Sequence, residues 1–417
     1  MNRCAKPLAG IVLGLAASFC QAAVTVEETR VTLPTYPPGP CDKNPVFYTG
    51  RVYQGAQGRV YPYPLQDVLH DERVNQDYTA LLLENEYLRL GLTADGYLAL
   101  YDRRARRQAL AGGGGVPLVI GDHSDTWSHG VEAFPQVLGQ MAATGAQLRE
   151  QGPVRGRLAV HFAWEDSRLT LEYLLGAAER HVEVRGRVDW RGRWQMLKLA
   201  FPVPFQARQW TAEVPYGTAA RPTDGGEEPV QRWVGLSGDG RGLSVVNDGR
   251  YSCSAEPSQL RVAILRSPPY AFHDPFRADD FDQHEFTEQG VQHFVLALVP
   301  HAGDWRQAGV VELARQLNRP PATLSETYHG GPLPKEAGFV RCEGKGVYIE
   351  ALKGAEDGGA LILRAAEWFG RSCTARFRLP SSRQTWAARF RPHQVKTFRI
   401  PIAGSGGRVC ETDMLEE

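Results

Sequence analysis

Alternation of hydrophobic and polar residues is the dominant pattern along this chain, and it predicts β-strands. In "LENEYLRLGLTADGYLALYD", leucines from Leu88 to Leu92 and from Leu98 to Leu100 occupy every second position. The turn-forming stretch Ala94-Asp95-Gly96 lies between the two runs. A period of two interrupted by such a turn predicts a β-hairpin.

The same period recurs in three later segments, Arg168–Leu175, His181–Trp190 and His293–His301. A period of two places alternate side chains on one face of a strand. The second segment therefore predicts one buried face, made by Val182, Val184, Val188 and Trp190.

One segment instead repeats its apolar residues at helical spacing, and it predicts a helix over Asp304–Asn318. Asp304 is a suitable N-cap residue, and Pro320-Pro321 would stop the helix. With almost no other helical pattern, the chain is predicted to be all-β.

Several strand patterns follow a polar stretch near the residues Tyr328–Glu336, which predicts a separate small β-sandwich. We expect a large β unit over 83–324, a linker over 325–337 and the small sandwich over 338–417. The run Gly112–Gly115 precedes no phosphate-binding helix pattern and is interpreted as a flexible hairpin tip.

The first 23 residues are typical of a signal peptide. Arg3 and Lys6 precede the short apolar run "PLAGIVLGLAASF", and Ala22 or Ala23 suits cleavage. Cys20 leaves lipidation as an alternative, although Phe19 does not match a lipobox. No later run is long enough to span a membrane. The sequence therefore predicts a secreted, periplasmic protein with an extended Pro/Tyr-rich segment over 24–82.

Composition narrows the classes of partner. Lys+Arg and Asp+Glu both number 47, so the chain lacks the basic excess of a nucleic-acid binder. No C-x-x-C pair is present, which argues against a cysteine zinc site. In an oxidising compartment a disulfide of Cys342 with Cys373 or Cys410 is expected.

A run of motifs in order resembles the C-terminal region of the family 38 glycoside hydrolases, the α-mannosidases. After the hairpin come "SDTWSHG", "VPYGTAARP", "LSVVNDGRYS", "LRSPPYAFHDP", "DQHEF" and "LVPHAGDW", and the resemblance covers Leu83–Ile402. It implies a galactose-mutarotase-like β-supersandwich followed by a small β-sandwich. Residues 24–82 resemble instead the opening of a group of bacterial β-sandwich proteins.

The resemblance also implies what this sequence lacks. In that family the zinc ligands and the nucleophilic aspartate lie in an N-terminal α/β barrel, and these residues have no counterpart here. We therefore expect neither a metal nor another cofactor.

The stretch "GDHSDTWSHGVEAF" (Gly121–Phe134) is the first candidate site and has three interpretations. His123, Asp125 and His129 could bind a metal, although they complete no recognised motif. The stretch could be a structural loop in which Asp125 and His129 hydrogen-bond to the backbone and Trp127 packs. It could also be a sugar-facing surface, with Trp127 stacking on a ring and Asp125 and His129 bonding to hydroxyls.

The stretch "YAFHDPFRADDFDQHEF" (Tyr270–Phe286) is the second candidate site. Crowded carboxylates raise one another's pKa, which can supply a general acid. A solvated acidic loop and a calcium site are the alternatives. The catalytic candidates are His129, Asp274, His284 and Glu285, and the substrate-binding candidates are Asp125, Trp127, His129, Tyr216, Arg221, His273, Asp274 and Asp282.

Three hypotheses of function follow. The first is a secreted protein that binds glycans or assists their degradation. The second is an independent glycosidase, epimerase or lyase with an acid/base pair in the supersandwich groove. The third is a structural partner of a separate catalytic chain. A separate prediction is that the two candidate stretches face one concave surface, although they lie far apart in the sequence.

Overall fold

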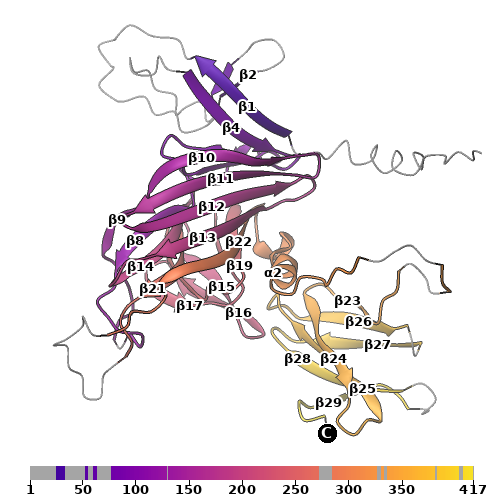
Figure 1. Cartoon of the computed structure of the whole chain (residues 1–417). Helices are drawn as coiled ribbons and strands as arrows, with labels where there is room; N and C mark the ends of the chain where they lie inside the picture. The colour runs from indigo at the N-terminus through magenta and orange to yellow at the C-terminus, as the bar shows by residue number, and fades with distance from the viewer. Residues whose placement is uncertain are drawn as a thin grey trace, which may run out of the picture. The chain divides into compact units, whose positions relative to one another are not determined.

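A computed structural model describes most of the chain and shows an all-β protein, which confirms the predicted fold class (Figure 1). The described residues are 25–32, 52–54, 60–62, 77–128, 130–271, 284–325, 330–332, 336–380, 383–402 and 407–416. The expected signal peptide and most of the Pro/Tyr-rich segment lie outside them. Among the helices in the described ranges, none has the length and hydropathy needed to cross a membrane.

The chain separates into two compact units. The first comprises 1–210 and 222–308, and the second comprises 211–221 and 309–417.

Two large antiparallel sheets make up most of the first unit and are layered one over the other in Figure 1. Residues 211–221, in the last two strands of the larger sheet, are assigned to the second unit. In spatial order the nine-stranded sheet contains β10 (Ala142–Gln151), β11 (Arg155–Trp164), β12 (Ser167–Gly176), β13 (Val182–Trp190), β22 (Gly290–Ala302), β19 (Arg241–Asn247), β18 (Trp233–Gly238), β15 (Gln209–Val214) and β16 (Gly217–Pro222). The six-stranded sheet contains β17 (Glu227–Pro229), β20 (Ser252–Glu256), β21 (Gln259–Ser267), β14 (Gln195–Pro202), β8 (Val116–Gly121) and β9 (Val137–Gln140).

Two smaller sheets precede these in the sequence. One has the order β1 (Thr25–Thr32), β4 (Asp77–Glu84), β5 (Leu88–Leu92), β6 (Leu98–Asp102) and β7 (Arg107–Gln108). The other pairs β2 (Val52–Gln54) with β3 (Val60–Pro62). The predicted hairpin is confirmed as β5 and β6, with Leu90 opposite Leu100.

The strand patterns describe the core of the first unit correctly. Val182, Val184, Val188 and Trp190 are all at most 1% exposed, as the period of two predicts. Gly186 lies on the same face of β13, where the Phe294 ring occupies the space that a side chain would take. Trp305 packs on Trp233 with ring centroids 4.5 Å apart. This aromatic pair extends the core of the first unit beyond the sheets.

Two more sheets form the second unit. One has the order β23 (Arg341–Glu343), β26 (Cys373–Leu379) and β27 (Gln384–Phe390), and the other β24 (Val347–Gly354), β25 (Ala360–Glu367), β28 (Val395–Pro401) and β29 (Cys410–Thr412). Phe377 is fully buried and lies within 6.3 Å of Trp386, Phe390 and Phe398, measured between ring centroids.

The predicted helix begins later than expected. Asp304 does cap, but it caps the 3-10 turn η4 (Trp305–Gln307), and the helix α2 runs only over Val310–Asn318. Gly309 separates them because it adopts a left-handed conformation, with φ of 70°. The helix ends before Pro320-Pro321 as predicted.

The interpretation of Gly112–Gly115 as a flexible tip is wrong. Gly113, Gly114 and Gly115 are buried, and Gly114 pairs with Leu98. A Cβ on Gly115 would lie 2.8 Å from the Tyr173 hydroxyl oxygen. The glycines are required here because the backbone passes too close to its neighbours for side chains.

The expected disulfide is also absent from the described residues: Cys253, Cys342, Cys373 and Cys410 are all free thiols. Cys342 pairs across strands with Phe377, four residues from Cys373 along β26. Four residues of strand span about 13 Å, well beyond the reach of a disulfide. Cys410 lies in the other sheet of the unit.

Candidate functional site

The two candidate stretches leave the six-stranded sheet at the same edge. β21 and β8 flank β14, and both run antiparallel to it. Gln195 of β14 is opposite Ser267, the last residue of β21, and opposite Gly121, the last residue of β8. The segments that follow these two strands therefore start side by side, although about 145 residues separate them in the sequence.

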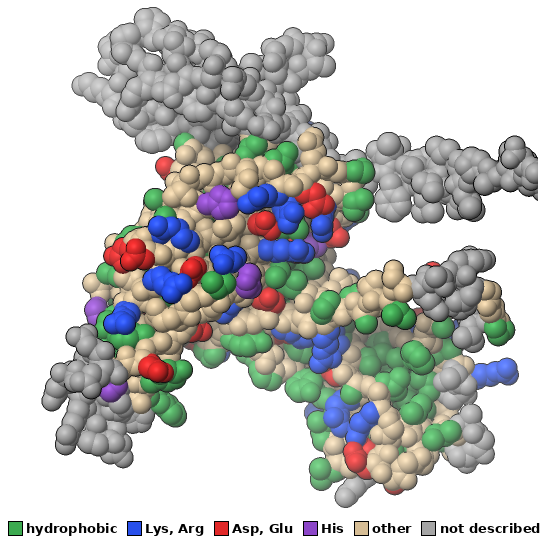
Figure 2. Space-filling model, viewed as in Figure 1, with side chains coloured by type: hydrophobic (Ala, Val, Ile, Leu, Met, Phe, Trp, Pro, Cys, Tyr) green, Lys and Arg blue, Asp and Glu red, His purple; other side chains and the backbone are tan. Residues whose placement is uncertain are grey.

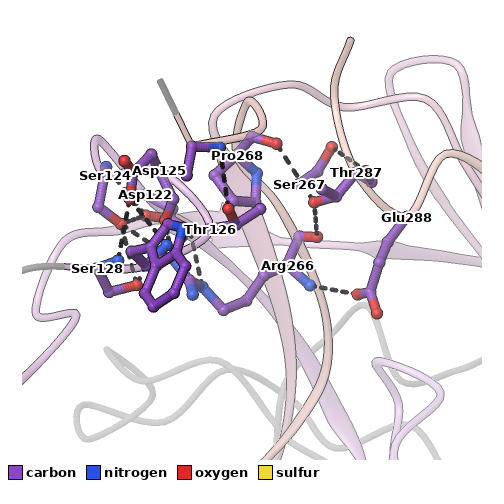
Figure 3. A network of polar contacts seen from close by, with 12 residues as sticks. Asp122, Ser124, Asp125, Thr126, Ser128, Arg266, Ser267, Pro268, Thr287 and Glu288 are labelled. Carbon is purple, nitrogen blue, oxygen red and sulfur yellow. Dashed lines mark hydrogen bonds and ion pairs between the residues drawn. The ribbon is translucent and has the colours of Figure 1, made fainter. Parts of the chain in front are cut away.

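Arg266 joins the two segments through its guanidinium group (Figure 3). Its Nε donates to Oδ2 of Asp122 at 2.9 Å, and its Nη2 lies 2.8 Å from the same oxygen. Nη2 also donates to Oγ of Ser124 at 2.9 Å. Asp122 is fully buried, so this pairing offsets the desolvation that an isolated carboxylate would suffer.

The tip of the first segment is a turn held by Asp125. Its Oδ1 accepts hydrogen bonds from the backbone N–H of Trp127 at 2.8 Å and of Ser128 at 3.1 Å. Its backbone oxygen accepts from Arg266 at 3.3 Å. The turn raises the Trp127 side chain, which is 65% exposed. Trp127 is therefore not a core residue, whereas the backbone hydrogen bonds that the structural-loop interpretation expects of Asp125 are present.

The second segment lies directly against this turn. The backbone N–H of Ala271 donates to Oγ1 of Thr126 at 3.0 Å. Tyr270, the residue before it, is 57% exposed, and its N–H donates to the Glu285 carbonyl at 3.2 Å. The two stretches thus present Trp127 and Tyr270 from adjoining backbone.

Side chains close the base of the second segment. Thr287 Oγ1 donates to the Arg266 carbonyl at 3.0 Å, and Ser267 Oγ donates to the Thr287 carbonyl at 2.9 Å. Glu288 Oε2 accepts from the Arg266 N–H at 2.7 Å. Figure 3 shows these contacts on the side of Arg266 opposite to Asp122. Hydrogen bonds on both sides of Arg266 therefore hold the two ends of the second segment in place.

Comparison with known proteins shows which family this chain is similar to. Residues 83–281 match the model of the glycosyl hydrolases family 38 C-terminal domain. The match includes both β8 with its turn and the start of the second segment. Residues 83–281 are therefore similar to a family 38 C-terminal domain and are called the family 38 domain below.

Relatives of this family 38 domain are named as α-mannosidases. The chain is 30% identical over 339 residues to human alpha-mannosidase 2C1, which covers 74% of this chain and 30% of the relative. It is 23% identical over 323 residues to alpha-mannosidase G of Dictyostelium discoideum, covering 71% of this chain and 28% of the relative. The chain thus spans about 30% of the length of these curated relatives.

A solved structure confirms the fold of the family 38 domain. A protein in glycosyl hydrolase family 38 from Enterococcus faecalis superposes with a TM-score of 0.63 at 14% identity. The superposition covers 76% of this chain and 44% of that one. The resemblance drawn from the sequence motifs is therefore confirmed.

The family 38 domain brings together only some of the predicted site residues. Asp125 and Trp127 lie beside the segment that carries Tyr270, and Glu285 is hydrogen-bonded to that segment through its backbone. His284 is partly buried and Glu285 is exposed. The other members of the set lie outside the described residues, namely His129, His273, Asp274 and Asp282.

Tyr216 and Arg221 belong to the second unit, on the hairpin of β15 and β16. Tyr216 occupies the turn of that hairpin with φ of 57°, and its ring lies 6.3 Å from the Trp368 ring between centroids. This position agrees with the alternative of a turn residue. A role of Tyr216 and Arg221 in contacting a sugar stays a prediction.

Sequence reasoning missed Asp122 and Arg266, the pair on which the site depends. Asp122 directly follows the apolar strand in "VPLVIGD", and Arg266 lies at the end of the apolar run "RVAILR" within β21. A charged residue directly after a buried strand was a usable signal, because such a residue needs a partner at the same sheet edge.

The described residues do not fit a zinc ion. They contain no group of three or more His, Cys, Asp or Glu side chains that could hold a metal. His123 is 3.0 Å from Oε1 of Gln136, measured from Nε2, so this imidazole already has a hydrogen-bond partner.

Proposed function

We propose that this chain is an exported glycan-binding protein whose ligand contacts the Trp127 surface, defined by residues 125–127, 270–271 and 284–285. One observation carries the proposal: a 65% exposed tryptophan stands on a turn that is fixed by hydrogen bonds. An exposed indole on rigid backbone offers a flat apolar face for a sugar ring.

The contacts around this indole support the proposal. Since Asp125, Thr126 and Arg266 hold the turn, little conformational entropy would be lost when a ligand binds. Tyr270 adds a second exposed ring from the adjoining segment. Exposed polar groups such as Glu285 could direct hydrogen bonds to hydroxyl groups.

The relation to family 38 supports a role in glycan metabolism. We assign binding to this chain and bond cleavage to a separate catalytic chain, because the described residues bring together an exposed aromatic surface but no group of three metal-ligating side chains. The signal-like run after Arg3 and Lys6 supports export to the periplasm.

Trp127→Ala tests the proposal. Loss of one stacking face should weaken glycan binding by about 1–2 kcal/mol, roughly 5- to 30-fold in Kd. The melting temperature should stay within about 2 °C of wild type, because exposed substitutions rarely change stability by more than about 0.5 kcal/mol. A glycan array identifies the ligand, and titration calorimetry measures both proteins.

Phe339→Ala is the matched control, because Phe339 is an exposed aromatic residue of the second unit (82%). It should leave glycan binding unchanged. Equal losses in the two variants, or an array without any ligand for the wild type, would rule the proposal out.

A further inference from the structure

The outer face of the nine-stranded sheet carries a dense set of charged side chains. Figure 2 shows arginine, acidic and histidine side chains gathered over β10 to β13. On β13 the outward residues Glu183, Arg185, Arg187 and Asp189 alternate with buried ones. This face is separate from the Trp127 surface, which lies at the edge of the other sheet.

One row of this face crosses four strands in exact register. His161 of β11 is opposite Thr170 of β12, Thr170 is opposite Arg187 of β13, and Arg187 is opposite His293 of β22. Directly opposed residues share a face, and neighbouring strands lie about 4.8 Å apart. These four residues, named here the cross-strand row, therefore form a line perpendicular to the strands.

Hydrogen bonds extend this row at both ends. Nδ1 of His161 is 2.9 Å from Oγ1 of Thr170. The Gln147 amide oxygen accepts from His161 Nε2 at 2.9 Å and from Arg149 Nη2 at 2.7 Å. At the other end, Nη2 of Arg250 donates to the His293 carbonyl at 2.8 Å. Hydrogen-bonded side chains therefore run along this row from β10 to beyond β22.

Carboxylates stand on the neighbouring rows, where each is paired with an arginine of the same face. Arg155 and Arg157 contact Glu150, and Arg157 also contacts Glu172. Glu183 pairs with Arg185, and Asp189 pairs with Arg191.

The cross-strand row itself contains no acidic residue. Within the described part of the chain, no carboxylate forms an ion pair with Arg149 or Arg187. The row therefore carries one guanidinium without a carboxylate partner, that of Arg187, and Arg149 adds a second one on β10, between rows whose charges are paired.

We propose that the cross-strand row binds a linear uronate polysaccharide, whose regularly spaced carboxylates would meet Arg149, Arg187 and the donors between them. Carboxylate is the anion that arginines of this face already bind, at Glu150, Glu172 and Glu183. Guanidinium groups suit this role because they present paired donors in a fixed plane.

The composition of the face favours a polysaccharide over other polyanions. Its outward strand residues include no Phe, Tyr or Trp among those described, whereas protein interfaces usually have aromatic anchors. Its carboxylates would repel the dense phosphates of a nucleic acid. The choice of a glycan rests on the proposed function, but the row does not depend on Trp127.

Binding of the full chain to polygalacturonate at low ionic strength tests the proposal, with methyl-esterified polygalacturonate as the uncharged equivalent. We expect binding to the acidic polymer alone and its loss as salt is raised. Arg187→Ala should weaken this binding by about tenfold or more, the scale of one charge-assisted contact. Arg185→Ala removes the same charge from the same strand, but from a residue paired with Glu183, and should weaken it less than about threefold.

Several outcomes would overturn the proposal: no binding to polygalacturonate, equal binding to the esterified polymer, tighter binding to dextran sulfate, or equal losses in the two arginine variants. Trp127→Ala separates this proposal from the proposed function. It should leave polygalacturonate binding unchanged even if the Trp127 surface binds no glycan.

Discussion

At the scale of single residues, His301 shows how the fold sets the chemistry of a side chain. It is 7% exposed at the end of β22, and Ser244 Oγ lies 3.1 Å from its Nε2. Burial lowers the pKa of His301, while the backbone at Gly303 and the charge of Asp304 oppose this shift. His301 therefore prefers the neutral state in the folded protein.

A pH dependence of stability follows from this preference. Below the ordinary pKa of 6.5 the unfolded chain takes up a proton that folded His301 does not, so stability falls as pH falls through this range. His301→Gln should reduce this dependence by at most about 1.4 kcal/mol per pH unit, the linkage of one proton. Urea unfolding at pH 7.5 and 5.5 measures it.

His293→Gln serves as the matched control for replacing a histidine, since His293 is exposed. His181 keeps its own share in both variants, because burial lowers its pKa too, against the opposing charges of Glu179 and Glu183. An unchanged pH slope in His301→Gln would contradict the assignment.

At the scale of elements, close approach between strands limits what the sheets tolerate. A Cβ on Gly186 of β13 would lie 2.0–2.5 Å from ring atoms of Phe294 on β22. Gly186→Ala should destabilise the protein by about 1–3 kcal/mol, the usual cost of overpacking a core. Gly145→Ala on β10 has open space around its Cβ and should have almost no effect.

Urea unfolding midpoints of the two glycine variants test this comparison. If Gly186→Ala unfolds at the wild-type midpoint, the packing between β13 and β22 described above is wrong.

At the scale of the whole molecule, the main prediction concerns zinc and hydrolysis. We predict that the purified protein carries no stoichiometric zinc and does not hydrolyse aryl α-mannosides by itself. The physical reason is that the described residues bring no three metal ligands together. Elemental analysis after dialysis checks the first part, and a chromogenic assay checks the second.

About one zinc per chain would contradict this prediction. It would also point to His123, Asp125 and His129 as the ligands, since they share one short segment. Hydrolysis that continues in Asp125→Asn and Glu285→Gln variants would place the reacting groups outside the Trp127 surface.

The sequence by itself determined the all-β class, the strands and the relation to family 38. Period-two alternation is a local consequence of burying one face of a strand, so Val182–Trp190 could be assigned without a structure. The helix start and the Gly112–Gly115 interpretation failed because a left-handed Gly309 and a close approach by Tyr173 leave no local pattern.

Only the tertiary structure decided how the site and the cross-strand row are assembled. Asp122 and Arg266 meet because β8 and β21 both flank β14, and strand order cannot be read from periodicity. The exposure of Trp127 likewise depends on the turn that Asp125 and Ala271 stabilise. Contacts between residues far apart in sequence depend on register across the sheet, which the fold as a whole fixes.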